Sequence, residues 1–145
     1  MSLAGKQEGV DITKVSPQQL QELAKAIETE LQQLSQSYNQ LMLGSRKFKE
    51  SKEVLVYLKE QGQGKEVMVP MTSSLYVPGV MEDTENVLVE VGANYFIEQG
   101  TEKAQDYCSR KQNLLSGNAK KVQEIIQVKK VQLQKVQGEF EKRVS

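Results

Sequence analysis

Apolar residues recur with a seven-residue period through the first half of the chain. One set occupies every seventh position: Leu20, Ile27, Leu34, Leu41, Phe48 and Leu55. A second set follows by four residues, and the seam weakens where this set becomes polar at its last two positions: Ala24, Leu31, Tyr38, Ser45 and Lys52. This alternation of steps of four and three is typical of the seam of a coiled coil. The unbroken pattern favours a long coiled-coil helix over the alternative, a single amphipathic helix packed on a globular core.

The sequence also marks where this helix begins and ends. Ser16 can cap the first turn, Pro17 suits the first helical position, and Gln19 completes a capping box with Ser16. Glycines that follow the periodic segment favour termination. We therefore predict a helix over residues 16–61, after a flexible N-terminal segment of residues 1–15.

A different pattern replaces the heptads between the two helical halves. Short β-branched or aromatic runs occupy residues 66–71, 75–80, 85–91 and 94–98, and turn-forming residues separate them. Two successive β-hairpins within residues 65–100 are the predicted structure.

The last segment, residues 101–145, returns to a helical pattern. Steps of four and three connect Leu115, Ala119, Val122, Ile126, Lys129, Leu133, Val136, Phe140 and Arg143. Upstream, Ala104, Tyr107, Lys111 and Leu114 keep the spacing but are out of phase by one residue. We predict a second coiled-coil helix that starts at Thr101, with a phase shift near Leu114.

The two predicted helices are nearly equal in length, about 65 Å each at the α-helical rise. Equal lengths indicate an antiparallel pair joined by the hairpins, so the predicted fold class is α+β and mainly α.

The hairpins are too small to enclose a core, and they expose unpaired strand edges. We expect several chains to share a β-barrel body from which the coiled coils project. The residues expected to assemble this body are Val67, Val69, Leu75, Tyr76, Val77, Val87, Val89, Val91, Tyr95 and Ile97.

Composition excludes several classes of chemistry. Among its 145 residues the chain has no His and one Cys, Cys108, which excludes histidine-based catalysis, a Cys/His zinc site and an intrachain disulfide framework. We therefore expect no enzyme activity, no metal and no cofactor. Nineteen basic residues balance nineteen acidic ones, so neither nucleic acid nor a membrane is an expected partner. No signal peptide is visible, and the expected localisation is cytoplasmic, with presence in the nucleus left open.

Two motifs that could bind ligands are better explained as loops. Residues 62–65 resemble part of a phosphate-binding loop, but Lys59 and Glu66 stand where that loop needs Gly and Ser or Thr. An acidic cluster at residues 82–85 lacks the ligand spacing of a calcium loop. We interpret the first motif as the end of a helix and the second as a solvated turn.

Two mid-helix glycines, Gly44 and Gly117, fall at nearly the same distance from the hairpins in an antiparallel pair. Each costs about 1 kcal/mol relative to Ala in a helix interior. One hypothesis is a shared soft point at which the helices flex. The alternative is a chance coincidence of two surface glycines.

Apolar side chains from both helices converge where the predicted coiled coil ends. The last apolar residues of a two-helix seam are only half covered, and exposed apolar patches of this kind mark binding sites. Such an end suits weak binding of non-native polypeptides without sequence specificity. The residues expected to bind are Ile12, Val15, Leu20, Leu23, Val136, Phe140 and Val144.

The hairpin region resembles the alpha-class prefoldins. The resemblance rests on residues 69–79 (VPMTSSLYVPG), on residues 86–92 (NVLVEVG) and on Tyr95. Further similarity is present in residues 11–13, before the first helix, and in residues 104–111, at the start of the second. The matching segments therefore span most of the first three quarters of the chain.

This resemblance implies that residues 1–145 form a single subunit of a hetero-hexamer, together with one further alpha-class and four beta-class subunits. Members of the family capture unfolded or nascent chains such as actin and tubulin without ATP, and deliver them to the cytosolic group II chaperonin. The helix tips would contact these clients, and the hairpins would hold the subunits together. The alternative function is a coiled-coil tether or adaptor for one dedicated folded partner, such as a transcriptional regulator.

Overall fold

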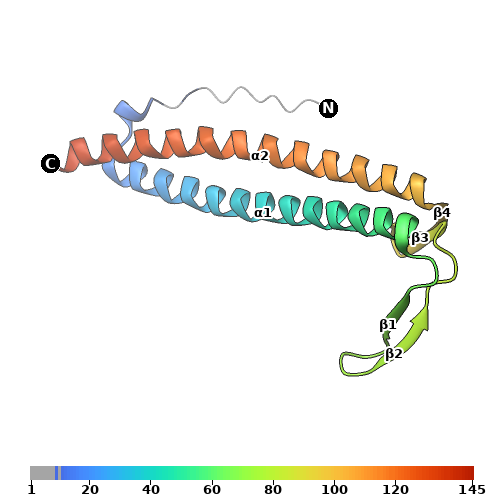
Figure 1. Ribbon diagram of the computed structural model, residues 1–145. Helices are drawn as coiled ribbons and strands as arrows, with labels where there is room; N and C mark the ends of the chain where they lie inside the picture. Colours follow the sequence, from blue (N-terminus) through green and yellow to red (C-terminus); the bar gives the residue numbers. More distant parts are fainter. Residues whose placement is uncertain (1–8, 10) are drawn as a thin grey trace. The chain divides into compact units, whose positions relative to one another are not determined.

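The computed structural model describes residue 9 and residues 11–145, and it contains two long helices separated by two β-hairpins (Figure 1). In chain order the elements are η1 (Ile12–Lys14, a 3-10 helix), α1 (Pro17–Gln61), β1 (Glu66–Pro70), β2 (Tyr76–Val80), β3 (Asn86–Gly92), β4 (Tyr95–Gly100) and α2 (Thr101–Val144). The predicted fold class, mainly α with two antiparallel strand pairs, is confirmed.

The chain divides into two compact units, which we describe separately. Unit 1 comprises Met1–Gln40 and Ala119–Ser145, and unit 2 comprises Leu41–Asn118 with all four strands. The two helices lie side by side and antiparallel within each unit. In unit 1 Glu30 pairs with Lys129 at 2.7 Å and Glu28 accepts a hydrogen bond from Gln137, while in unit 2 Ser45 contacts Ser116 and Lys59 contacts Glu102.

The predicted seam is confirmed on both helices. All eleven periodic residues of α1, and all nine of α2 from Leu115 to Arg143, are buried or half-buried. The apolar core of unit 1 consists of Leu20, Ile27 and Val136, with Ile12, Val15, Leu23, Ala24, Leu31, Leu133 and Phe140 packed against it. Burial of this shared stripe stabilises both helices, because tertiary packing supplies most of the stability of helices in proteins.

The predicted phase of the first half of α2 is wrong at Leu114. Leu114 is exposed, whereas Ala104, Cys108, Leu115 and Ala119 are buried or half-buried. The covered side of α2 therefore contains residues 111, 115 and 119, which are separated by two consecutive steps of four residues. An extra step of four locally unwinds a coiled coil, and here it brings Leu115 rather than Leu114 against α1.

The N-terminal segment is partly folded, which corrects the prediction of a flexible segment over residues 1–15. Ile12–Lys14 form η1, and the Asp11 carboxylate accepts hydrogen bonds from the backbone N–H of Thr13 at 3.0 Å and from its hydroxyl at 2.6 Å. This local bond stabilises a turn too short to produce a periodic apolar pattern. Residues 1–8 and residue 10, which the prediction also covered, lie outside the described residues.

Both boundaries predicted for α1 are confirmed. The backbone N–H of Ser16 donates to the Gln19 side chain, and the N–H of Gln19 donates to the Ser16 hydroxyl, each at 3.2 Å. These reciprocal bonds are a capping box. At the other end, a side chain on Gly62 would meet the carbonyl oxygen of Leu58 at 2.7 Å, so only glycine fits there.

The two predicted hairpins are confirmed, with β1 paired to β2 and β3 paired to β4. In the second hairpin Gly92 pairs with Tyr95, and the two residues between them, Ala93 and Asn94, have φ angles of 49° and 62°. Positive φ at both central positions is the geometry of a type I′ turn, whose twist matches that of the strands. A register shift between Glu90 and Gly92 marks a bulge next to this turn.

Candidate functional sites at the helix ends and the hairpins

An apolar cluster lies where α1 begins and α2 ends, within unit 1. Leu20 and Val136 are buried, with 0% and 3% of their surfaces exposed, while Ile12, Val15, Leu23 and Phe140 are half-buried. We call these six residues the tip cluster. Val144, the seventh residue predicted here, is 64% exposed and lies at the end of α2. The structure therefore brings six of the seven predicted tip residues into one cluster.

A small open cavity of about 350 Å³ adjoins the tip cluster. Leu20, Ala24 and Phe140 provide its apolar lining, and the polar side chains of Gln21, Gln137 and Glu141 complete it. Amide and carboxylate groups around an apolar hollow can hydrogen-bond a polypeptide backbone while the hollow takes a side chain. The cavity thus suits one apolar residue of an extended chain.

Arg143 is the residue at this site whose role sequence reasoning missed. Its periodic position placed it in the seam, and it is half-buried there. Its guanidinium donates hydrogen bonds to backbone carbonyls of the segment before α1. An arginine at a seam position was the available signal, because a half-buried guanidinium needs acceptors nearby.

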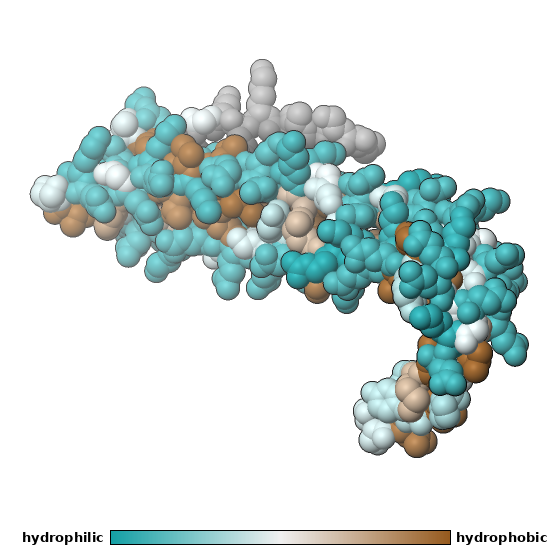
Figure 2. Space-filling view, viewed as in Figure 1, coloured by the Kyte–Doolittle hydropathy of each residue, from teal (hydrophilic) through white to brown (hydrophobic). Residues whose placement is uncertain are grey.

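The β1–β2 hairpin exposes apolar side chains on both of its faces. The register places Val67, Val69 and Val77 on one face. Met68 and Val80 lie on the other face with Tyr76, and all six of these side chains are exposed. Figure 2 shows brown, apolar patches on this hairpin among paler side chains of intermediate hydropathy. Leu75, also predicted for assembly, is exposed in the turn, whereas Met68, Met71 and Val80 were not predicted although they are equally exposed.

The β3–β4 hairpin has one face toward the helices of unit 2. Val87 and Val89 are half-buried and line a cleft of about 700 Å³ with Phe48, Leu55 and other residues of α1 and α2. Val91, Tyr95 and Ile97 are exposed, as are two residues that sequence reasoning missed, Leu88 at 70% and Phe96 at 60%. Strand alternation identifies two faces but does not say which one the helices cover.

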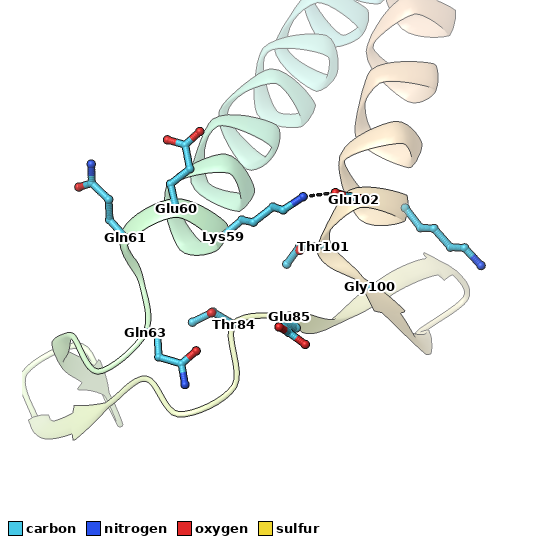
Figure 3. A pocket seen from close by; sticks show the side chains of 10 residues that line it. Lys59, Glu60, Gln61, Gln63, Thr84, Glu85, Gly100, Thr101 and Glu102 are labelled. Carbon is cyan, nitrogen blue, oxygen red and sulfur yellow. Dashed lines mark hydrogen bonds and ion pairs between the residues drawn. The ribbon is translucent and has the colours of Figure 1, made fainter.

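A polar cavity of about 800 Å³ lies in unit 2 where α1 ends and α2 begins (Figure 3). Its lining includes the ion pair of Lys59 with Glu102, and the Lys59 ammonium lowers the pKa of the Glu102 carboxyl. Thr84 and Thr101 are buried beside it, and the N–H of Thr101 donates to the carbonyl of Glu85 at 2.8 Å. These contacts join the two helices to the loop between the hairpins.

The loop between the hairpins is shaped by Asp83. Its carboxylate accepts hydrogen bonds from the N–H groups of Glu85 at 2.9 Å and Asn86 at 3.3 Å. These bonds lower the pKa of Asp83, with the Glu85 bond as the largest cause. The acidic cluster, predicted to be a solvated turn, is therefore a loop in which the Asp83 carboxylate binds backbone N–H groups of the same loop.

Cys108 is buried on α2, and burial raises the pKa of its thiol, an effect that the nearby Lys52 only partly opposes. A raised pKa disfavours the thiolate, which is the nucleophilic form. Among residue 9 and residues 11–145, no three His, Cys, Asp or Glu side chains are grouped to hold a metal ion. Neither long helix, within that same part of the chain, is apolar enough over a sufficient length to cross a membrane.

Comparison with known proteins agrees with this architecture. The family model described as "Prefoldin subunit" matches residues 27–145. A probable prefoldin subunit 5 from Dictyostelium discoideum is 37% identical over 140 residues, covering 97% of this chain and 87% of that protein. Human prefoldin subunit 5 is 37% identical over 129 residues, covering 89% and 84%. A filamentous prefoldin from Methanocaldococcus jannaschii, solved by cryo-EM, shares the fold with a TM-score of 0.70 at 24% identity, covering 81% of this chain and 97% of that one.

Two long helices and two exposed hairpins therefore define a subunit of a coiled-coil co-chaperone rather than an enzyme. The chain belongs to the prefoldin family. The resemblance to the alpha-class prefoldins is confirmed, and other prefoldin subunits are its partners. The expectation that it is not an enzyme is confirmed by this membership.

Proposed function

We propose that the chain is one of two alpha-class subunits of a hetero-hexamer with four beta-class subunits, and that this complex captures unfolded or nascent polypeptides. Its clients include actin and tubulin, which the complex delivers to the cytosolic group II chaperonin. Binding takes place at the helix tips and needs no nucleotide, metal or other cofactor. The proposed location is the cytoplasm.

The β1–β2 hairpin carries this proposal, because it exposes apolar side chains on both faces at once. An isolated two-stranded hairpin is only marginally stable in water, and contiguous exposed apolar side chains mark contacts with other chains. Assembly with other prefoldin subunits would bury Val69 and Val77 on one face and Met68 and Tyr76 on the other. The proposed β-barrel body accounts for this exposure.

Client capture follows from joining several weak sites in one particle. The cavity beside the tip cluster takes one apolar residue, so a single tip binds an unfolded segment weakly. Several tips held on one body raise the effective concentration of each site for a client already bound at another. An unfolded chain offers many apolar segments, whereas a folded protein buries them, and this difference provides the selectivity.

Assembly is tested by co-expressing the chain with the five other subunits and measuring the particle mass. Tyr76→Asp places a charge on an exposed apolar hairpin face and is expected to abolish the six-chain particle. Asn113→Asp is the matched control, since it adds the same charge at an exposed position of α2. A normal hexamer yield with Tyr76→Asp contradicts a role of this face in assembly.

Client binding is tested by suppression of aggregation of denatured actin by the assembled complex. Replacing Leu23 and Phe140 with Ser removes two half-buried tip side chains and is expected to reduce protection severalfold. Replacing the exposed Val128 and Val131 with Ser is the control, because it removes two apolar side chains from α2 outside the tip cluster. Tight binding of one folded protein, with no protection of denatured actin, would instead favour the tether.

A further inference from the structure

The segment before α1 is fastened to the end of α2 by one side chain. We call residues 11–15 the strap. The Arg143 guanidinium donates to the carbonyl oxygens of Ile12, at 3.2 Å, and of Thr13 and Val15. Its Nε donates to the Glu139 carboxylate at 3.2 Å, which orients the guanidinium. One planar fork with five donors thus holds three carbonyls of the strap.

The strap also covers apolar surface. Ile12 and Val15, three residues apart, both pack against the core of Leu20, Ile27 and Val136. Figure 1 shows the strap, in blue, beside the red end of α2. Asp11 stabilises this turn, because its carboxylate accepts hydrogen bonds from the N–H and the hydroxyl of Thr13. One short structured segment therefore supplies both the two apolar side chains and the carbonyls that Arg143 binds.

These contacts are ones that any extended polypeptide could make. Backbone carbonyls are present at every residue, and two apolar side chains a few residues apart are common in unfolded chains. A guanidinium that binds carbonyls therefore recognises a chain without reading its sequence. A site for unfolded clients must bind backbone groups and apolar side chains, and these are the groups through which the strap is bound.

We propose that the strap occupies the client site of its own chain, and that an unfolded segment binds by displacing it and taking over the carbonyl bonds to Arg143. This inference rests on the proposed function. It makes Ile12 and Val15, two of the residues predicted to bind clients, part of a competing internal segment, and it adds Arg143 as a client-binding residue. Covering the tip while no client is present would also shield its apolar side chains from self-association. The apparent affinity for a client then equals the affinity of the open tip multiplied by the fraction of molecules in which the strap is open.

The test compares three complexes, each reconstituted with the other prefoldin subunits, in binding a labelled lysozyme that has been reduced and carboxymethylated so that it stays unfolded. The first carries the full chain. The second carries a chain that begins at Ser16, which keeps the capping box and Arg143. The third adds Arg143→Ala to this shortened chain, and Lys142→Ala in the same background is its matched control.

Removal of the strap is expected to tighten binding about tenfold, the gain for a strap closed in about nine molecules of ten. Arg143→Ala is then expected to weaken binding severalfold in the shortened chain, and Lys142→Ala to leave it unchanged. Equal or weaker binding without the strap overturns the inference while leaving the proposed function intact. Absence of lysozyme binding by every complex, the full chain included, contradicts the proposed function itself.

A peptide competition tests the inference independently, in case the shortened chain folds poorly. A synthetic peptide of residues 9–16 is expected to displace lysozyme from the shortened complex. The same peptide with Ser in place of Ile12 and Val15 is expected to compete at least several times less well, because it lacks the two packing side chains. Equal competition by both peptides overturns the assignment of the strap to the client site.

Discussion

The hydroxyl oxygens of Ser45 on α1 and Ser116 on α2 lie 2.7 Å apart across the seam of unit 2. Ser45 is 5% exposed, and its hydroxyl also donates a hydrogen bond to the carbonyl oxygen of Gln112 at 3.3 Å. A pair of hydroxyls within the seam, which is mostly apolar, favours one register of the two helices over others, at some cost in stability. The two serines thus mark the level at which the helices align.

Loss of the serine pair should lower stability in a non-additive way. Ser45→Ala is expected to lower the free energy of unfolding by about 1 kcal/mol, because Ser116 loses a hydrogen-bond partner in a half-buried position. The double variant with Ser116→Ala should cost less than the sum of the single changes. Chemical denaturation measures all three, and Ser51→Ala, an exposed serine on the same helix, is the control. Strict additivity would argue against a coupled pair.

The two mid-helix glycines should respond differently to alanine. A side chain on Gly117 would meet no atom within 4 Å, whereas one on Gly44 would lie 3.0 Å from Cδ1 of Leu115. Gly117→Ala is therefore expected to raise the free energy of unfolding by about 1 kcal/mol, and Gly44→Ala by less, because Leu115 must shift. Thermal unfolding measures both, and an equal gain at the two sites would contradict the close contact.

The same contact bears on the proposed soft point at the glycines. Gly44 is half-buried against α2 and has a packing reason to lack a side chain, so it is not a chance surface glycine. Flexing at this level stays a hypothesis. Hydrogen exchange at the amides near Gly44 and Gly117, compared with the turns on either side, tests it, and uniform exchange along both helices would contradict it.

The β3–β4 turn contains a strained alanine. Ala93 has a φ of 49°, in the left-handed region that costs a residue with a Cβ about 1 kcal/mol relative to glycine. Ala93→Gly is expected to stabilise the hairpin by about 0.5–1 kcal/mol. Asn94→Gly is the matched comparison and should gain less, since Asn tolerates this region better. Hydrogen exchange of the β3 and β4 amides measures the effect, and slower exchange only with Asn94→Gly would contradict this account.

The Lys59–Glu102 ion pair should make a small, pH-dependent contribution. Lys59 lowers the pKa of Glu102 below its ordinary value of 4.5. The stability it adds is therefore present above that value and is lost as the pH falls through the lowered pKa of the folded state. Glu102→Gln should unfold at a slightly lower temperature than the wild type near neutral pH, and this difference should shrink in acid, as the pH falls below 4.5.

A matched control for this pair is Glu60→Gln, which removes a carboxylate from the same cavity without touching the pair. Its unfolding temperature should differ from the wild type by a smaller amount that varies less between neutral and acidic pH. A difference for Glu102→Gln that persists in acid would mean that the glutamate acts through packing rather than charge.

The amino-acid sequence by itself determined the elements of this protein and their pairing. The heptads identified the seam from Leu20 to Leu55, the capping box at Ser16 set the start of α1, and the short β-branched runs identified both hairpins. These features depend on residues a few positions apart, so local periodicity and capping chemistry are enough to specify them. The apolar residues at the helix ends were visible for the same reason.

Only the tertiary structure decided which surfaces those elements cover. Burial of Leu115 instead of Leu114 depends on the partner helix beside Gly44, and the inward position of Val89 depends on Phe48 and Leu55 across the cleft. The carbonyls that Arg143 binds belong to residues about 130 positions away, and the two serines of the seam are separated by 71. Such contacts have no local signature, because they arise only when distant segments pack together.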